Sequence, residues 1–467
     1  MKKRHCIDKK SNAKANPNGT DNAGISDAQN FPENKTDETL SAESTEKNEK
    51  IDYEKLLETS ISFAKKFQEC GAETYRVEES IERIIKAYGI NKVDTFVIPS
   101  SIMASLETDD GKVFTKLRRI KASDTNMDGI EKYNDLSRKI CVETPPLKKF
   151  RRMVDETTAR IVNYSKLTIY LANIIVAVGF AVFFGGNFAD ALCSGLCGLA
   201  TGLCMNSMGT LNVNPFFKTF VSGFILSFLA QALTALGLCM RADAVTIGPI
   251  MLLVPGFLFT NSLRDIIGGD TMSGVNRLVQ VVIIATAMVV GTGAGVSLAK
   301  VLWKLPEPVE IIDHSLLIQT FVGVVGTFGF CLILNIHGSG MALCLLGGAF
   351  SWLAYKFCVE IGISENISYL IASACVSFYA EIIARVRKYP AISYLLASLV
   401  PLIPGAGIYY TMSFAVSGDM NAFLNRGVAT AAIAVSLAAG VLLVSTMFRM
   451  WGVWHKRRIS RNSRTAK

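Results

Sequence analysis

The pattern of hydrophobic and polar positions divides the chain into three main parts. Residues 1–50 are polar and almost free of large apolar side chains, residues 51–163 mix apolar and charged positions, and apolar runs dominate from 164 to 450. A chain that buries little apolar surface cannot offset the entropy lost on ordering. We therefore expect a disordered tail over 1–50, and a basic cytoplasmic tail over 451–467.

Residues 51–163 have the periodicities of a small α+β domain. Two helical stripes, 56–67 and 77–88, are followed by Gly71 and Gly89, which can form left-handed caps. Alternating positions then predict three strands, at 93–98, 101–107 and 113–121. A helix over 126–142 and a basic helix after Pro145-Pro146 are expected to lead to the first apolar run.

The apolar part predicts a helical, polytopic membrane protein, because its runs are long and nearly uncharged. We expect about ten segments, at 166–185, 190–206, 217–238, 244–263, 278–301, 315–335, 341–358, 368–384, 391–415 and 427–449. Basic clusters flank the first, eighth and tenth segments, so the positive-inside rule places both termini in the cytoplasm of a cell-membrane protein. No apolar leader follows Met1, and no cleaved signal peptide is expected.

Two of these segments carry the same interruption. The fourth contains Leu-Val-Pro-Gly ending at Gly256, and the ninth contains Val-Pro-Leu-Ile-Pro-Gly ending at Gly405. The prolines are 404 − 255 = 149 residues apart, and a Gly-Asp pair and an Asn-Arg pair repeat that offset (419 − 270 and 426 − 277). We infer a duplication, with one transmembrane repeat over 164–302 and the other over 315–450. Because each repeat has five segments, an odd number, the two repeats should be inverted.

Proline removes a backbone donor, so both interruptions should break their helices and leave polar backbone groups for a ligand. The exposed helix N-terminus favours an anion, which suggests a small polar, carboxylate-bearing substrate. The alternative is that proline and glycine only shape helix packing. Our candidate substrate-binding residues are Pro255, Gly256, Asn261, Pro401, Pro404, Gly405, Tyr409 and Tyr410.

Glu381 is the deepest acidic residue of the eighth segment, and the neutral Gln231 occupies the matching position of the first repeat. An intramembrane carboxylate is a candidate for proton coupling. Arg385 follows one helical turn later, so a local ion pair is an equally good interpretation.

Other chemistry has less support. Cys193, Cys197 and Cys204 share a helical face, but neighbouring glycines favour close helix packing over a metal site, and we expect no metal and no cofactor. The net charge of +9 is explained by membrane anchors rather than by nucleic acid. Residues 51–163 contain no histidine, which excludes Ser/His and Cys/His catalysis there and leaves only a carboxylate mechanism through Glu73 or Glu78.

Three motifs together carry a resemblance. "GAETYRVEES" (Gly71–Ser80), "IPSSIMAS" (Ile98–Ser105) and "VPLIPG" (Val400–Gly405) resemble the threonine/serine exporter family of bacterial and fungal membrane proteins, here with both halves in one chain. The resemblance implies export of threonine and serine driven by the proton gradient, or export of dicarboxylates such as succinate. It also implies a regulatory motif in the soluble domain, at Glu73, Arg76 and Glu78.

The resemblance covers 51–451 and is imperfect at the first interruption, where Leu252 stands in place of the first proline of the second. The leading hypothesis is a secondary transporter without enzymatic activity. A membrane-anchored enzyme acting through the N-terminal domain and a passive channel are the alternatives, and the oligomeric state is left open.

Overall fold

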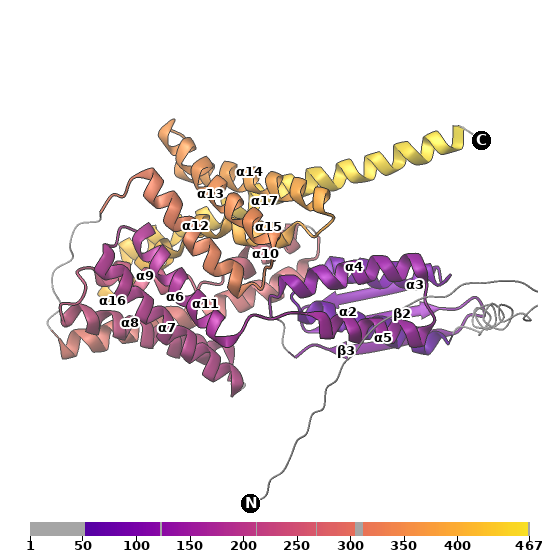
Figure 1. The fold of residues 1–467 in the computed structure, drawn as a ribbon, viewed down its shortest axis with the longest axis horizontal. Coiled ribbons are helices and arrows are strands. Elements are labelled where there is room, and N and C mark those ends of the chain that lie inside the picture. Colours follow the sequence, from indigo (N-terminus) through magenta and orange to yellow (C-terminus); the bar gives the residue numbers. More distant parts are fainter. Residues whose placement is uncertain (1–51, 122–123, 212, 268, 304–311, 466–467) are drawn as a thin grey trace, which may run out of the picture. The chain divides into compact units, whose positions relative to one another are not determined.

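The structure is a computed structural model that describes residues 52–121, 124–211, 213–267, 269–303 and 312–465. Within these ranges an α+β domain precedes a long helical region (Figure 1). The tail predicted over residues 1–50 lies outside the described residues.

The α+β domain follows the predicted order of elements closely. Its helices and strands are α2 (Tyr53–Glu69), α3 (Thr74–Ala87), β1 (Lys92–Ile98), β2 (Ser101–Glu107), β3 (Val113–Arg119), α4 (Met127–Glu143) and α5 (Leu147–Arg160). The strands form an antiparallel sheet in the order β1-β2-β3, against which α2 and α3 pack. Leu56, Ile84 and Ile102 are almost fully buried in the core of this domain, and so is Tyr133 of α4, whose ring packs against Phe63 of α2. Gly71 and Gly89 have positive φ, as their capping roles require.

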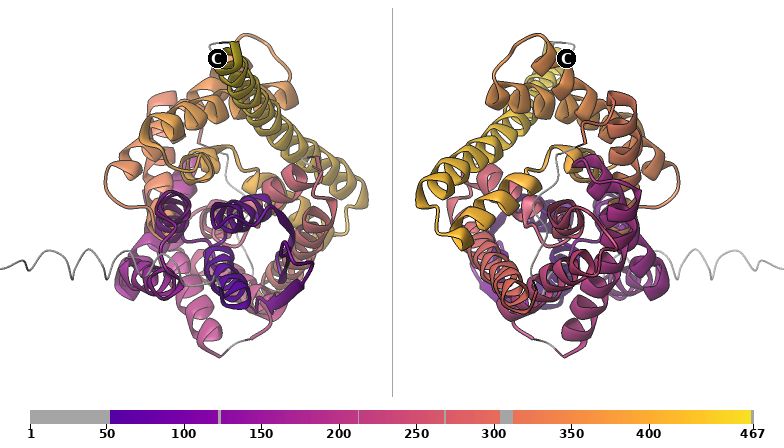
Figure 2. Two further views of the ribbon diagram at one scale, coloured as in Figure 1. Left: turned by 90° about the vertical axis from the view of Figure 1, so that its right-hand side faces the viewer. Right: turned by 90° about the vertical axis from the view of Figure 1, so that its left-hand side faces the viewer.

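The helical region alternates long helices with two pairs of short ones. It consists of α6 (Lys166–Phe183), α7 (Phe188–Thr210), α8 (Pro215–Ala235), α9 (Ala242–Ile250), α10 (Gly256–Ile267), α11 (Thr271–Leu302), α12 (Leu316–Ile333), α13 (Ser339–Glu360), α14 (Glu365–Arg387), α15 (Ile392–Leu399), a 3-10 turn η2 (Val400–Leu402), α16 (Gly405–Ser417) and α17 (Met420–Thr465). The last helix, drawn in yellow, runs along the edge of the region (Figure 2).

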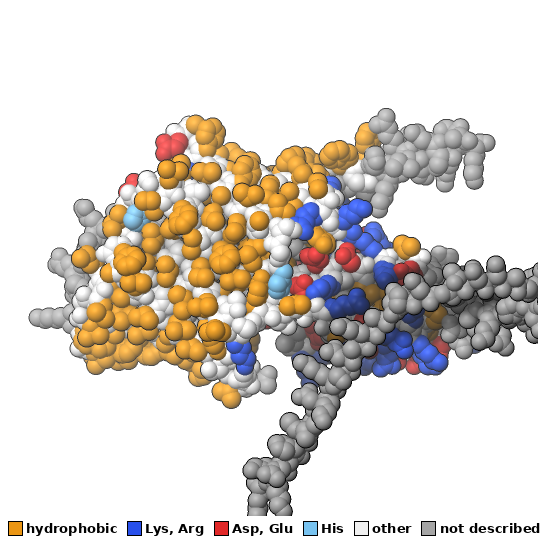
Figure 3. Space-filling view, in the orientation of Figure 1, with side chains coloured by type: hydrophobic (Ala, Val, Ile, Leu, Met, Phe, Trp, Pro, Cys, Tyr) orange, Lys and Arg blue, Asp and Glu red, His pale blue; other side chains and the backbone are white. Residues whose placement is uncertain are grey.

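Eight helices of the described residues are long and apolar enough to cross a membrane, and one bent pair, Ile392–Leu402 with Gly405–Ala415, is a possible ninth. Of the ten predicted segments, the fourth is therefore the one not found as a span: it is divided into α9 and α10, which have only 9 and 12 residues, and unlike α15 and α16 these two helices do not form one bent span. On the face shown in Figure 3, apolar side chains dominate the helical region, whereas charged side chains gather on the α+β domain. The chain is therefore a multi-pass membrane protein.

Both predicted interruptions are breaks in the structure. One separates α9 from α10 on either side of Pro255, and the other separates α15 from α16 between Pro401 and Pro404, with a bend of 49°. Proline explains both, because it lacks the N–H that continues the helical ladder and its ring clashes with the preceding turn.

The helices from α6 to α11 pack as those from α12 to α17 do. Helix α8 lies along α11, as α14 lies along α17, and α10 contacts α11, as α16 contacts α17. Short turns repeat as well: Gly269 and Gly418 have φ of 98° and 79°, and both Asp270 and Asp419 cap the next helix by accepting an N–H three residues later. These shared features are what the predicted duplication requires.

Helices α6 and α12, the first of each set, pack against each other in opposite directions. The N–H of Tyr164, just before α6, donates to Asn335, just after α12, at 3.2 Å. The N–H of Ile312, just before α12, donates to the carbonyl of Gly185, just after α6, at 3.4 Å. The start of each helix therefore lies beside the end of the other.

The predicted close packing at the glycines of α7 is confirmed. A Cβ at Gly198 would lie 2.6 Å from the Cβ of Ala177 on α6, and one at Gly202 would lie 2.1 Å from the amide nitrogen of Asn173. Only glycine permits α6 and α7 to approach this closely.

Candidate functional site

The two helix breaks contact each other. A Cβ at Gly256, the first residue of α10, would lie 3.0 Å from the side chain of Ile403 in the other break. A Cβ at Gly405, the first residue of α16, would lie 2.1 Å from the sulfur of Met251. Met251, Ile403 and Phe257 belong to one apolar cluster. Segments about 150 residues apart in the sequence thus meet at their interruptions.

This contact brings two helix N-termini into the same part of the structure. Helix α10 begins at Gly256 after Pro255, and α16 begins at Gly405 after Pro404. The first N–H groups of each helix have no partner in their own helix, and each N-terminus carries roughly half a positive charge. Such an arrangement is suited to holding a carboxylate.

The predicted tyrosines lie on α16 and reach the first half of the chain. Tyr409 is 9% exposed and packs in a cluster with Cys193 and Ile247. The hydroxyl of Tyr410 donates to Asp243 at 3.3 Å. The ring of Tyr409 thus fills an apolar interface, whereas Tyr410 presents a polar group to α9.

Asp243 belongs to a charged group that sequence reasoning did not identify. It pairs with Arg241 at 2.5 Å, and Arg241, only 3% exposed, also donates to the carbonyl of Gly185 at 2.7 Å. The carboxylate of Asp190 accepts the backbone N–H of Arg241 at 3.0 Å. A buried arginine beside a half-exposed carboxylate offers both charges that a zwitterionic amino acid needs.

The sequence gives little reason to single out Arg241 and Asp243, because charged residues are common in the loops that precede apolar segments. What distinguishes them is the burial of Arg241, since a buried charge must be paired.

Asn261, another predicted binding residue, lies on α10 and is partly buried. Pro401 lies in η2 and is buried beside Val400 and Leu402.

Glu381 lies near the end of α14 and forms an ion pair with Arg385 at 2.6 Å, with 20% and 49% of the two side chains exposed. The guanidinium of Arg385 also lies over the ring of Phe448, 4.2 Å from its centre. Gln231, the matching residue of the first half, is buried. The local ion pair weighed in the sequence is therefore present.

The soluble motif that begins at Gly71 contacts the helical region directly. The hydroxyl of Thr74 donates to Asp270, the cap of α11, at 2.7 Å. Asp270 comes three residues after the end of α10, the helix that begins at the first break. The hydroxyl of Ser273, also on α11, donates to the carbonyl of Val97 at 3.3 Å. The motif therefore ties the soluble domain to the segment downstream of the first break.

The predicted motif residues have structural partners. Glu73 is 2% exposed and pairs with Arg76 at 2.8 Å. Glu78 accepts the N–H of Val97 at 2.9 Å, and its pKa is raised by burial and by the nearby charges of Asp270 and Glu82. A buried, paired Glu73 is poorly placed to act on a substrate from solution, so this geometry does not favour the hydrolase alternative.

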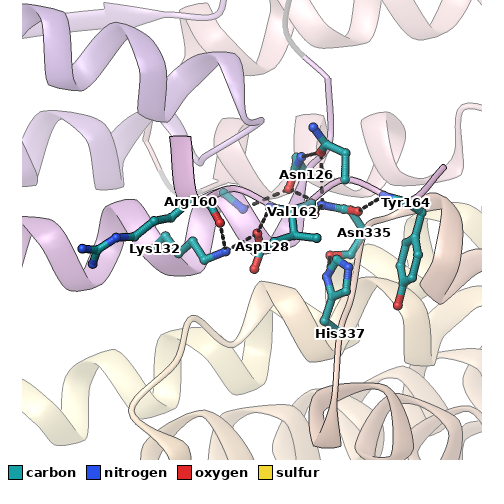
Figure 4. Close-up of polar contacts among 10 residues, drawn as sticks. Asn126, Asp128, Lys132, Arg160, Val162, Tyr164, Asn335 and His337 are labelled. Carbon is teal, nitrogen blue, oxygen red and sulfur yellow. Dashed lines mark hydrogen bonds and ion pairs between the residues drawn. The ribbon is translucent and has the colours of Figure 1, made fainter. Parts of the chain in front are cut away.

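A second junction joins the soluble domain to the turn between α12 and α13 (Figure 4). The amide of Asn335 donates to Asn126 at 3.0 Å and to the carbonyl of Val162 at 2.7 Å. His337 lies in this turn with its ring stacked on that of Tyr164, the two ring centres being 4.3 Å apart. The soluble domain thus contacts both halves of the helical region.

Two protein families match this chain, and together they cover most of it. Residues 58–299 match the family described as "Putative threonine/serine exporter", and residues 319–447 match the family described as "Threonine/Serine exporter, ThrE". The chain is 24% identical over 400 residues to a "Threonine/serine exporter" of Corynebacterium glutamicum, covering 82% of this chain and 79% of that protein. It is 22% identical over 407 residues to a "Probable threonine/serine exporter" of Mycobacterium tuberculosis, covering 83% and 75%. No solved structure matches the chain.

Proposed function

Because the chain belongs to the threonine/serine exporter family, we propose that it is a secondary transporter that exports L-threonine and L-serine. The multi-pass helical region and the names of the two relatives support this assignment. The single observation that carries the mechanism is the contact between the two helix breaks, at Gly256 with Ile403 and at Gly405 with Met251.

The proposed architecture is two inverted five-segment repeats, in which α9 with α10 and α15 with α16 each form one interrupted crossing. The opposite directions of α6 and α12 support the inversion, since these helices begin the two halves. Transporters with inverted repeats place the substrate at interrupted helices in equivalent positions, and one repeat rocks against the other to alternate access. The contact between the breaks is the natural pivot for such a motion.

Substrate recognition is proposed to use both backbone and side chains. The N-termini of α10 and α16, after Pro255 and Pro404, would hold the carboxylate of an amino acid. Arg241 and Asp243 form a charge pair that reaches Tyr410 of the other half at the end of α9 away from the break, so we place them along the transport pathway and not in the site that holds the carboxylate. The predicted residues Gly256, Asn261, Pro401, Gly405 and Tyr409 would shape this site.

We further propose that export is coupled to the proton gradient. Glu381 stays the candidate predicted from the sequence, although its pairing with Arg385 gives it a structural role as well. Asp243 is a second carboxylate to consider, because it contacts Tyr410 across the two halves. A carboxylate that exchanges its partner during the cycle could bind and release a proton.

The soluble domain is proposed to be cytoplasmic and regulatory. Two observations support this proposal: basic residues end α14, and Arg387 among them acts on Glu131 of the soluble domain, which suits a cytoplasmic face under the positive-inside rule. Through Thr74 and Asp270 the motif at Glu73, Arg76 and Glu78 would sense or limit movement of the first break.

The proposal is tested by reconstituting the full chain into proteoliposomes and imposing a proton gradient. We expect saturable flux of L-threonine and L-serine that collapses when a protonophore dissipates the gradient. Flux that ignores the gradient and does not saturate would identify a channel. Flux of succinate but not of threonine would identify a dicarboxylate carrier, and absence of all flux with correctly inserted protein would refute transport of these substrates.

A further inference from the structure

The soluble domain shares an apolar core with the second half of the helical region. One cluster of buried side chains contains Ile130 and Tyr133 of α4 together with Leu334 and Ile336 of the turn after α12 and Tyr394 of α15. The clusters that contain the first half and the helix breaks have no buried member from the described part of the soluble domain. Domains joined by an apolar interface resist relative motion, so the soluble domain should move with the second half.

Polar contacts strengthen this docking on the second half. The amide of Asn335 donates to Asn126 at 3.0 Å (Figure 4). The hydroxyl of Tyr389, in the turn before α15, interacts with the carboxylate of Glu131 on α4. Two separate turns of the second half therefore hold the same face of the soluble domain.

The contact with the first half is polar. The hydroxyl of Thr74 donates to Asp270 at 2.7 Å, and the hydroxyl of Ser273 donates to the carbonyl of Val97 at 3.3 Å. Thr74, Val97 and Ser273 are each at most 1% exposed, so these hydrogen bonds lie inside the junction and not at its edge. Hydrogen bonds can be exchanged for bonds to water when two surfaces separate, whereas a shared apolar core would have to be exposed.

Two adjacent residues of the "GAETYRVEES" motif contact opposite halves. Thr74 reaches Asp270, the cap of α11 in the first half. The ring of Tyr75 lies under the guanidinium of Arg449 on α17, which is 5.2 Å from the ring centre. Helix α10, which leads to Asp270, packs against α17. The start of α3 therefore spans the α10–α17 interface, along which the two halves meet.

The charged residues of the motif hold Thr74 and Tyr75 in place. Glu73, which is 2% exposed, directly precedes α3 and pairs with Arg76 at 2.8 Å. Arg76 also donates to the hydroxyl of Tyr75 at 3.3 Å. The buried pair thus fixes the two residues that contact opposite halves, and it can do so without touching a substrate.

We propose that Thr74 and Tyr75 form a gate over the α10–α17 interface and that the soluble domain moves as one body with the second half. The gate is closed in this structure. It opens when the hydrogen bonds of the soluble domain with Asp270 and Ser273 break while the contacts with Tyr389 and Arg449 are kept. The inference rests on the proposed alternating-access transport, because a gate is needed only if the two halves move against each other.

The moving contact is tested by cross-linking introduced cysteines in proteoliposomes. Thr74→Cys with Asp270→Cys places two thiols across the gate, and a short bifunctional methanethiosulfonate joins them through disulfides that dithiothreitol reverses. We expect the joined protein to lose at least tenfold in L-threonine flux and to regain the flux on reduction. The same reagent applied to the unaltered chain, which has its own cysteines, should leave the flux unchanged.

A matched pair tests which body moves. Glu131→Cys with Tyr389→Cys joins the soluble domain to the second half, where these two side chains already interact. Cross-linking this pair should leave the flux within about twofold of the uncross-linked value, because the proposed motion keeps the contact. Loss of flux with this pair as well would show that the soluble domain does not move with the second half. Flux that survives cross-linking of Thr74→Cys to Asp270→Cys would overturn the gate.

A second measurement needs neither flux nor cross-linking. Thr74 is 0% exposed, so the thiol of Thr74→Cys is shielded in the closed gate and reacts with a maleimide only after the gate opens. Ser60→Cys on α2, also 0% exposed, is the control, because its side chain is reached only by unfolding of the soluble domain. In lipid nanodiscs without substrate, mass spectrometry of the labelled peptides should show Thr74→Cys reacting at least tenfold faster than Ser60→Cys. Equal rates would overturn the gate.

The results separate the gate from the export function. Faster labelling of Thr74→Cys in a protein that transports neither threonine nor serine would support the gate and refute the export function. Threonine flux that persists with the gate cross-linked would support export and overturn the gate. If the cysteine pair at Thr74 and Asp270 is inactive before cross-linking, the labelling rates decide.

Discussion

The contact between the two helix breaks can be tested by adding one methyl group. In Gly405→Ala the new Cβ would lie 2.1 Å from the sulfur of Met251. Non-bonded heavy atoms rest about 3.5–4 Å apart, so the methyl is roughly 1.5 Å too close. Met251 is 3% exposed, so its side chain has little free space to move into. We expect a loss of about 1–3 kcal/mol in the free energy of unfolding, as overpacking usually costs.

A second substitution turns this into a measurement of the contact itself. Met251→Ala alone should cost about 2–5 kcal/mol because it leaves a cavity. Combined with Gly405→Ala it removes the clash, so the double variant should lose about 1–3 kcal/mol less than the sum of the two single losses. Chemical unfolding in detergent micelles measures all four proteins, and threonine flux in proteoliposomes reports whether the breaks still work.

The control for the added methyl group is Gly452→Ala on α17, where a Cβ would meet no atom within 4 Å. It should be neutral or stabilising by up to about 1 kcal/mol, since alanine favours a helix. If the losses of Gly405→Ala and Met251→Ala add to within about 0.5 kcal/mol, the two breaks do not touch and the proposed pivot is wrong.

Three further variants test individual side chains. Tyr410→Phe removes the hydroxyl that contacts Asp243 and should raise the KM for threonine by roughly three- to tenfold with little change in Tm; an unchanged KM would remove Tyr410 from the site. Glu381→Gln should flatten the pH dependence of transport if Glu381 carries the proton, and an unaltered profile would leave it only the ion pair with its arginine. Burial raises the pKa of Glu78, so the folded state favours the protonated carboxyl and the free energy of unfolding falls as pH rises through that pKa. From about pH 5 to about pH 7.5 the Tm of the wild type should therefore fall more than the Tm of Glu78→Gln. Parallel curves of Tm against pH would contradict this.

The elements of the soluble domain and the two helix breaks were predictable because their causes are local. Glycine caps, alternating strand positions and prolines act on their immediate neighbours. Gly269 and Gly418, which are separated by the same offset of 149 residues, both adopt a positive φ. Local chemistry, repeated at a constant spacing, was enough for these features.

Features that depend on distant contacts could not be predicted. Nothing near Met251 or Ile403 in the sequence indicates that each meets a glycine of the opposite break. The importance of Arg241 lies in its burial, which is a property of the fold. Helix α17 extends to Thr465, well beyond the apolar segment predicted to end at 449, because lysine and arginine are themselves good helix formers.

The most direct test of the export function is threonine efflux from cells. A bacterial strain that lacks its own threonine exporter can be loaded with a threonine-containing dipeptide, which intracellular peptidases cleave, and efflux is then compared with and without this chain. We predict that cells with the chain release threonine and serine faster and accumulate less of each inside. If the chain reaches the membrane and internal threonine rises as in the empty strain, the central claim is contradicted.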